Sequence, residues 1–229
     1  MTKIFILLFF IFLSTGCYDY KELNNLAIIS GIALDYDNEE NKYKLTFEIL
    51  NDDKVVDDLE SSHKTYYVNG EGKSITDAFN NTNLEINKIS YYSHIKAMII
   101  SEEIAENHAE DFIDYFVRNS YINNLFYILV AKNDDAKKIL ESTNVENRII
   151  SESISKLMDN SALGNSLSIK VTLEDYVSLY VNPMQDIHLP SVTLDDDKLK
   201  LQGIAIFHKN ELKDILNFNE TQTLNILFD

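Results

Sequence analysis

The sequence predicts an α+β fold, with mixed sheets and interspersed helices. Short apolar stretches that suit strands alternate irregularly with stretches of helical spacing, unlike the regular alternation of a doubly wound sheet. The composition is globular, since 45% of the 229 residues are hydrophobic and only 2 are proline. A chain of this length is long enough for one or two domains.

Apolar runs bounded by turn residues predict the strands. Residues 26–34 are apolar with few breaks, and residues 43–50 alternate between apolar and polar. The acidic segment 35–41 between them is rich in turn residues, which favours two strands joined by a loop. The dipeptide Lys209-Asn210 marks a turn later in the chain. The expected strands are 26–34, 43–50, 65–68, 95–100, 125–131, 187–194, 199–207 and 212–216.

Capping residues predict where several helices begin. Ser74 and Ser101 are good N-caps, and Asn219 precedes the last expected helix. Thr172 with Asp175 three residues later fits a capping box. Apolar residues then recur at three- and four-residue spacing, most clearly after Ser101. The expected helices are 75–86, 102–117, 134–140, 146–158, 173–180 and 220–229.

The charge balance excludes one class of partner. Acidic residues outnumber basic ones by 37 to 20, which gives a formal net charge of -17. Nucleic-acid binding needs a basic face, so we expect no nucleic-acid partner. An anionic membrane surface would also repel this charge weakly, so membrane attachment would need something other than electrostatics.

The N-terminal residues 1–16 have the pattern of a secretory signal peptide. Lys3 provides a short basic start, and the apolar run 4–13 follows. Ten helical residues extend about 15 Å, which is too short to span a hydrocarbon core of about 30 Å. Small residues come next and end at Gly16, directly before Cys17.

Cys17 is the only cysteine in the chain, so it cannot form an internal disulfide. Its setting resembles the lipobox of bacterial lipoproteins, in which the thiol is diacylated and the chain is cut before the cysteine. We therefore expect cleavage between Gly16 and Cys17 and a diacylglyceryl anchor, because two acyl chains hold a protein stably on a bilayer. Ser14 stands where a leucine is usual, with Leu13 one place earlier. A free, unmodified cysteine is the alternative.

The sequence shows no pattern that predicts an enzyme, a cofactor or a metal. It contains no HExxH, GxSxG, P-loop or GxGxxG motif. The acidic clusters lack the loop of a calcium site. His108 lies in the apolar stripe of an expected helix, and we interpret it as a packed or partly exposed residue. The histidines, none of them paired at zinc-ligand spacing, are His63, His94, His108, His188 and His208.

Motifs along the whole chain resemble those of one family. Cys17, Asp19 and the run Glu22-Leu23-Asn24 precede an apolar strand that ends in Gly31-Ile32-Ala33-Leu34-Asp35. This is similar to the start of mature Ger(x)C lipoproteins, the C subunits of bacterial spore germinant receptors. The resemblance covers residues 17–229. Further similar segments are "GKSITDAF", "SHIKAMIISEEIAE", "DYFVRNSYINNLFYILVAK", "LPSVTL" and "LQGIAIFHKNELKDILNFNETQ".

The chain also departs from the family pattern. Tyr18 replaces a usual tryptophan, and Ser93 replaces a glycine before His94. Family members usually continue past the dipeptide Glu220-Thr221 into another domain, whereas 8 residues follow it here. We therefore expect a truncated chain with a signal peptide (1–16), a Ger(x)C N-terminal region (17–196) and the start of a C-terminal domain (197–229).

The resemblance implies a non-catalytic subunit of a nutrient germinant receptor that takes part in spore germination. It would be lipid-anchored on the outer face of the cell membrane, which is the inner membrane of the spore, with A and B receptor subunits as partners and without a cofactor. We interpret the family-motif positions as structural, with Asp114 and Arg118 forming a helical ion pair. These positions are Asp19, Glu22, Leu23, Gly31, Lys73, His94, Asp114 and Arg118.

Two other functions stay open. A surface lipoprotein that binds a small solute for a transporter should have two similar lobes around a cleft. An envelope lipoprotein enzyme should bring titratable groups together in a pocket.

Overall fold

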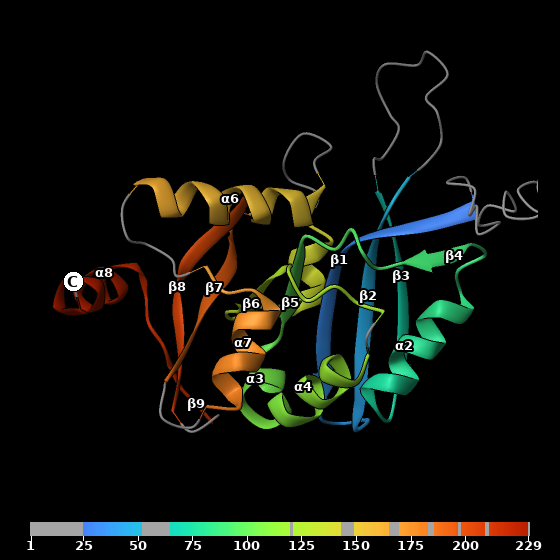
Figure 1. Cartoon of the computed structure of the whole chain (residues 1–229), viewed down its shortest axis with the longest axis horizontal. Helices are drawn as coiled ribbons and strands as arrows, with labels where there is room; N and C mark the ends of the chain where they lie inside the picture. The colour runs from blue at the N-terminus through green and yellow to red at the C-terminus, as the bar shows by residue number, and fades with distance from the viewer. Residues whose placement is uncertain are drawn as a thin grey trace, which may run out of the picture.

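In the computed structural model, one nine-stranded sheet runs through the part of the chain that the structure describes (Figure 1). The sheet is mixed, and helices cover both of its faces, so the predicted α+β class is confirmed. The structure describes residues 25–51, 65–119, 121–142, 149–164, 170–182, 186–196, 198–208 and 211–228.

The sheet has a parallel centre between antiparallel hairpins. Strands β1, β5, β6 and β7 are parallel neighbours, and the path through the sheet is β3-β2-β1-β5-β6-β7-β8-β9. The short β4 pairs with the first residues of β1. The strands are β1 (Leu26–Asp37), β2 (Lys42–Leu50), β3 (Thr65–Gly72), β4 (Ile89–Tyr91), β5 (Ala97–Ile100), β6 (Tyr127–Ala131), β7 (Ile187–Asp195), β8 (Lys198–His208) and β9 (Glu211–Ile215).

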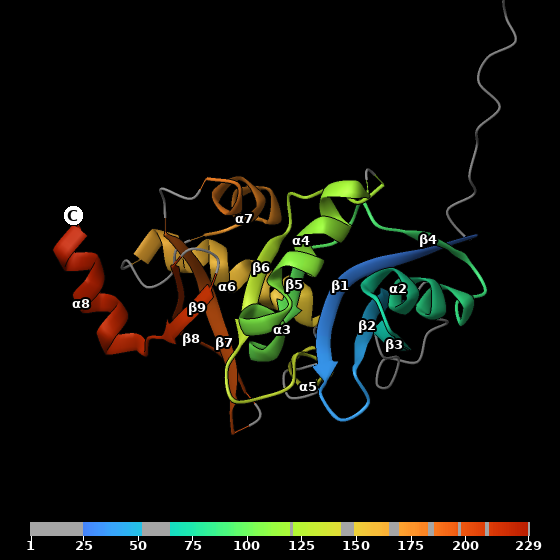
Figure 2. The ribbon, with the colours of Figure 1, turned by 90° about the horizontal axis from the view of Figure 1, so that it is seen from below.

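Helices form a layer on each face of the sheet. Helices α2, α3, α4 and α7 pack on one face, and α5 and α6 on the other, whereas α8 contacts β8. Figure 2 views the face that carries α3 and α4. The helices are α2 (Ile75–Leu84), α3 (Glu102–Asn107), α4 (Ala109–Arg118), α5 (Ala136–Leu140), α6 (Ile150–Gly164), α7 (Leu173–Tyr180) and α8 (Phe218–Phe228).

The strand period of two divides the core between the two faces. On β1, Ile32 and Leu34 belong to the core under α2, α3, α4 and α7, whereas Ala33 belongs to the core under α5 and α6. All three side chains are fully buried. The central strands are apolar on both faces for this reason, which is why they appear in the sequence as continuous apolar runs.

The prediction of one continuous helix after Ser101 is wrong. The expected helix 102–117 is two helices, α3 and α4, separated at His108, whose backbone has φ -130° and ψ 17°. The His108 ring lies 3.8 Å, between ring centroids, from Tyr36 and within hydrogen-bond distance of the Tyr43 hydroxyl. These contacts with β1 and β2 hold His108 outside helical geometry, although the apolar spacing continues through it.

Other differences concern the ends of elements. Strand β4 was not expected, β3 continues to Gly72 rather than residue 68, and α2 ends at Leu84 rather than residue 86. Strands β7 and β8 form a hairpin in which Asp195 pairs with Lys198, so the domain boundary expected after residue 196 falls in its turn. None of the described helices is long and apolar enough to cross a bilayer.

Candidate functional site

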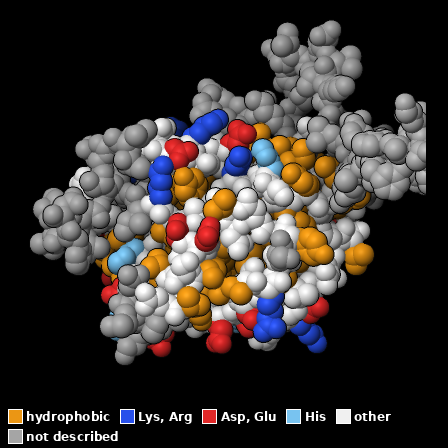
Figure 3. All heavy atoms as spheres, viewed as in Figure 1, with side chains coloured by type: hydrophobic (Ala, Val, Ile, Leu, Met, Phe, Trp, Pro, Cys, Tyr) orange, Lys and Arg blue, Asp and Glu red, His pale blue; other side chains and the backbone are white. Residues whose placement is uncertain are grey.

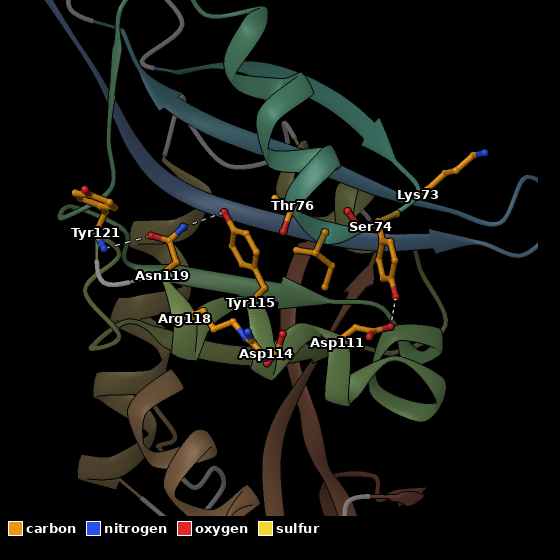
Figure 4. A pocket seen from close by; sticks show the side chains of 11 residues that line it. Lys73, Ser74, Thr76, Asp111, Asp114, Tyr115, Arg118, Asn119 and Tyr121 are labelled. Atoms are coloured by element: carbon orange, nitrogen blue, oxygen red, sulfur yellow. Dashed lines mark hydrogen bonds and ion pairs between the residues drawn. The ribbon is translucent and has the colours of Figure 1, made fainter.

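A pocket of about 500 Å³ opens between the start of α2 and the exposed side of α4 (Figure 4). Three of the eight family-motif positions line it: Lys73, and the helical neighbours Asp114 and Arg118, which follow Lys73 by about 40 residues. The pocket is lined by Tyr43, Lys73, Ser74, Ile75, Thr76, Asp111, Asp114, Tyr115, Arg118, Asn119 and Tyr121.

A sharp turn between β3 and α2 forms one wall. The Ser74 hydroxyl accepts a hydrogen bond from the Asp77 backbone N–H at 3.1 Å, so Ser74 caps α2 as predicted. Gly72 lies against the first turn of the helix, and a Cβ there would be 2.4 Å from the Ala78 nitrogen. Only glycine allows this approach. Lys73 follows directly, and its exposed side chain points away from the other lining residues (Figure 4).

Helix α4 forms the opposite wall. Arg118 Nε donates to Asp114 Oδ1 at 2.6 Å, the helical pair that the spacing predicts. Tyr115 stacks on Phe79 of α2 with ring centroids 4.4 Å apart, and its hydroxyl accepts a hydrogen bond from Asn119 Nδ2 at 3.1 Å. Burial raises the pKa of the Tyr115 phenol. This stacking joins the two helices at the base of the pocket.

A hydrogen-bonded group closes one end of the pocket. The Tyr43 hydroxyl donates to Asp111 Oδ2 at 2.6 Å and lies 3.1 Å from His108 Nδ1. Burial and the neighbouring Asp111 carboxylate both raise the pKa of Tyr43, so the phenol stays protonated at physiological pH. Tyr43 therefore acts here as a hydrogen-bond donor to Asp111.

The pocket's chemistry suits binding. Its hydroxyl, carboxylate, amide and guanidinium groups match a polar ligand with charges of both signs. Its carboxylates at Asp111 and Asp114 contact a tyrosine and an arginine, and no nucleophile–base pair is formed among the lining residues. Across the described ranges, no group of three or more His, Cys, Asp or Glu residues is placed to hold a metal ion.

The remaining predicted positions lie elsewhere. Gly31 lies in β1 beside a register shift in its pairing with β2, and His94 lies in the turn before β5, as expected for a strand entry. Neither lines the pocket. The positions outside the described residues are Gly16, Cys17, Asp19, Glu22 and Leu23.

Sequence reasoning missed two buried carboxylates that cap helices on the other face of the sheet. Glu48 on β2 is fully buried, and it accepts hydrogen bonds from the backbone N–H of Ile150 at 2.7 Å and of Ser151 at 3.1 Å. The Ser30 hydroxyl donates to it at 2.9 Å. Burial raises the pKa of Glu48, against the opposing effect of these hydrogen bonds.

Asp35 makes the same type of contact at α5. It accepts hydrogen bonds from the backbone N–H of Ala136 at 2.7 Å and of Lys137 at 2.9 Å. Burial raises the pKa of Asp35 to about 6. Each carboxylate lies about 100 residues from its helix in the sequence, so no local pattern in the sequence pointed to this capping role.

Comparisons with known proteins identify the family. A family model described as spore germination protein N-terminal domain matches residues 19–194. Spore germination protein KC of Bacillus subtilis (strain 168) is 26% identical over 219 residues, covering 85% of this chain and 53% of that protein. Spore germination protein B3 of the same organism is 24% identical over 230 residues, covering 98% of this chain and 60% of that protein.

The chain therefore spans somewhat more than half the length of these relatives. A solved structure described as the crystal structure of the GerBC protein is 21% identical, with a TM-score of 0.43, and the match covers 90% of this chain and 57% of that one. The resemblance seen in the sequence is confirmed by the family model: the chain belongs to the family of spore germination proteins that share this N-terminal domain.

Proposed function

We propose that this protein is a non-catalytic, lipid-anchored subunit of a nutrient germinant receptor that takes part in spore germination. The observation that carries the proposal is the family match across residues 19–194, together with relatives named as spore germination proteins. Its partners would be the membrane-spanning A and B subunits of the receptor. It would lie on the outer face of the cell membrane, which becomes the inner membrane of the spore.

The proposed attachment to the membrane depends on Cys17. A signal peptide of residues 1–16 would direct export, and cleavage after Gly16 would leave a diacylated Cys17 as the first residue. Two acyl chains contribute roughly 0.8 kcal/mol per buried CH₂, which is enough for stable anchoring. Residues 17–196 would form the N-terminal region, and residues 197–229 the start of a further domain.

The pocket between α2 and α4 supports a binding role over catalysis. Its phenol at Tyr43 is held protonated, and its carboxylates face a tyrosine and an arginine. A solute-binding lipoprotein, the other function considered, would be built as two lobes around a cleft. The described residues instead form one continuous sheet, with the pocket between two helices on a single face.

Affinity purification of this protein from detergent-solubilised spore membranes tests the proposal. We expect mass spectrometry to recover the multi-span A and B subunits with it. Recovery of the intact protein alone, under conditions in which another receptor of the same spores stays assembled, would contradict the proposal. A periplasmic-type permease as the main partner would support the solute-binding function instead.

A further inference from the structure

One edge of the sheet carries most of the large apolar side chains that the structure describes as exposed. This edge, which we call the leading edge, is where β1, β3, β5 and β6 begin. The strand registers place these starts together, because Ile29 pairs with Ile49 and Ile49 with Tyr66, while Ala97 pairs with both Gly31 and Tyr127. Helices α2 and α4 return to the same edge, since each connects the end of one of these strands to the start of the next strand.

Among the residues whose side-chain burial the structure describes, which leave out residues 161–164 and 224–228, nine large hydrophobic residues are exposed, and six lie at the leading edge. Leu84 at the end of α2 is 81% exposed, and Tyr121 after α4 is 85% exposed. Ile89 and Tyr91 are half-exposed on β4, which pairs with the first residues of β1. Apolar side chains are visible over α2 and β4 on the right of Figure 3. The six are Tyr66, Leu84, Ile89, Tyr91, Tyr121 and Leu125.

The described segments at the two edges of the sheet differ in how many charged residues they carry. At the leading edge, residues 84–96 contain one acidic residue and two lysines, and residues 119–126 contain no charged residue. At the far edge, acidic residues lie at or just after the ends of β1, β5 and β6, and several line a second pocket there. Lysines lie among them, and Lys42, Lys44 and Lys138 form ion pairs with these acidic residues. These acidic residues are Asp35, Asp37, Glu39, Glu40, Glu102, Glu103, Asp134 and Asp135.

The connection between β2, which ends at Leu50, and β3, which begins at Thr65, is acidic in sequence. Residues 51–64 of this connection contain five acidic residues and two lysines, and residues 52–64 lie outside the described ranges. The charges at this edge therefore would not attract it to an anionic surface. Its exposed side chains offer hydrophobic contact, with three tyrosines of the kind that favours the interface between water and lipid.

The length of chain before β1 limits which edge can reach a membrane. Leu26 lies nine positions after Cys17, and a fully extended chain reaches about 30 Å over nine residue steps. Strand β1 itself is 12 residues long and carries its far end about 36 Å farther away. Figure 2 shows this geometry, with β4 and the end of α4 at the top and the β1–β2 turn at the bottom.

We propose that the leading edge rests on the lipid bilayer, with Leu84, Ile89 and Tyr91 in the interfacial layer and the charged far edge pointing away. The proposal rests on the lipid anchor at Cys17 proposed above. A short tether at this edge holds the exposed apolar side chains beside the bilayer at high effective concentration. Insertion of these side chains would then fix the orientation that a flexible tether alone would leave free.

Tryptophan fluorescence can test this contact, because the chain contains no tryptophan. Tyr91→Trp places one reporter on the leading edge, and Asn38→Trp places the control in the exposed β1–β2 turn at the far edge. Each lipidated full-length variant is reconstituted into phosphatidylcholine vesicles that contain a phospholipid brominated near the glycerol. We expect at least twofold stronger quenching at residue 91 than at residue 38, with a blue-shifted emission. Equal quenching at the two positions would overturn the proposal.

Further measurements separate the possible failures. Flotation of the vesicles reports the lipid anchor, so a protein that floats without quenching at residue 91 retains its anchor and refutes the contact. A protein that does not float refutes the anchor and this contact with it. Leu84→Trp repeats the test at a side chain that is almost free of packing. Shielding of residue 91 only in membranes that contain A and B subunits would assign the edge to a protein partner and overturn the lipid contact.

Discussion

Gly31 on β1 and Ser151 in the first turn of α6 lie so close that a Cβ on Gly31 would be 2.9 Å from the Ser151 Cβ. The same Cβ would be 2.9 Å from Leu140 Cδ1 and 3.0 Å from Glu48 Oε2. A side chain at Gly31 would therefore push α6 away from the sheet and disturb the carboxylate that caps it. This contact gives the family-motif glycine a packing role.

Gly31→Ala should destabilise the fold. Overpacking of a tight interior costs about 1–3 kcal/mol, and the free energy of unfolding should fall by that amount. Chemical denaturation of the wild type and the variant measures the difference. A change below about 0.5 kcal/mol, within the range of ordinary surface substitutions, would show that α6 does not need this approach.

Asp35 should make the protein less stable as the pH rises from acid to neutral. Burial raises its pKa from 3.8 to about 6 in the folded protein, so the folded state binds the proton more tightly than the unfolded chain. Protonated Asp35 therefore adds to the free energy of unfolding below pH 3.8, and this stabilisation is lost as the pH rises to about 6. A shift of about two pKa units between the unfolded and folded states corresponds to a change of about 3 kcal/mol in the free energy of unfolding.

Asp35→Asn removes this titration. Urea denaturation at pH 4 and at pH 7 should therefore show a smaller loss of unfolding free energy in the variant than in the wild type. Glu48, whose pKa burial also raises, contributes in the same direction in both proteins and cancels in the comparison. Identical pH dependence in the two proteins would contradict the assignment.

The Asp114–Arg118 pair should contribute little to stability. Its side chains are 56% and 78% exposed, and exposed ion pairs contribute about 0–1 kcal/mol. Arg118→Ala should lower the free energy of unfolding by less than about 1 kcal/mol, as should Lys156→Ala, which breaks a comparable exposed pair with Glu152 on α6. If Arg118→Ala alone reduced recovery of the A and B subunits, the pair would act in recognition, against our structural interpretation.

Cys17→Ser should release the protein from membranes. The serine hydroxyl cannot take the diacylglyceryl group, and no described helix could span a bilayer in its place. Fractionation of cells that express the wild type and the variant, followed by a high-salt wash, measures the membrane-bound share. A variant that stays fully bound after the wash would contradict the lipid anchor.

Local rules predicted the starts of three helices. The expected cap Asn219 was wrong, because α8 begins at Phe218 and Asn217 Oδ1 accepts hydrogen bonds from the backbone N–H groups of Asn219 and Glu220. Ser74, Ser101 and Thr172 cap α2, α3 and α7 as expected, and Thr172 forms the expected capping box with Asp175. Each cap joins atoms that are three residues apart, so the sequence contains all the information that the contact needs. The Asp114–Arg118 pair could be predicted for the same reason.

Contacts between segments that are distant in the chain could not be predicted from local sequence rules. The break at His108 depends on Tyr36 and Tyr43, and the start of α6 depends on Glu48, about 100 residues earlier. Strand β4 exists because the first residues of β1 extend past their other neighbours and pair with it. The pocket likewise needs α2 and α4 to pack side by side, which stacking of Tyr115 on Phe79 achieves.

By itself the sequence determined the α+β class, the helix caps and the family, because these depend on local spacing and on motifs read in order. Only the tertiary structure decided the order of the strands, the roles of Asp35 and Glu48, and the contrast between the apolar leading edge and the charged far edge. The physical reason is that sheet pairing brings together residues that are distant in the chain, and no periodicity within either segment specifies its partner.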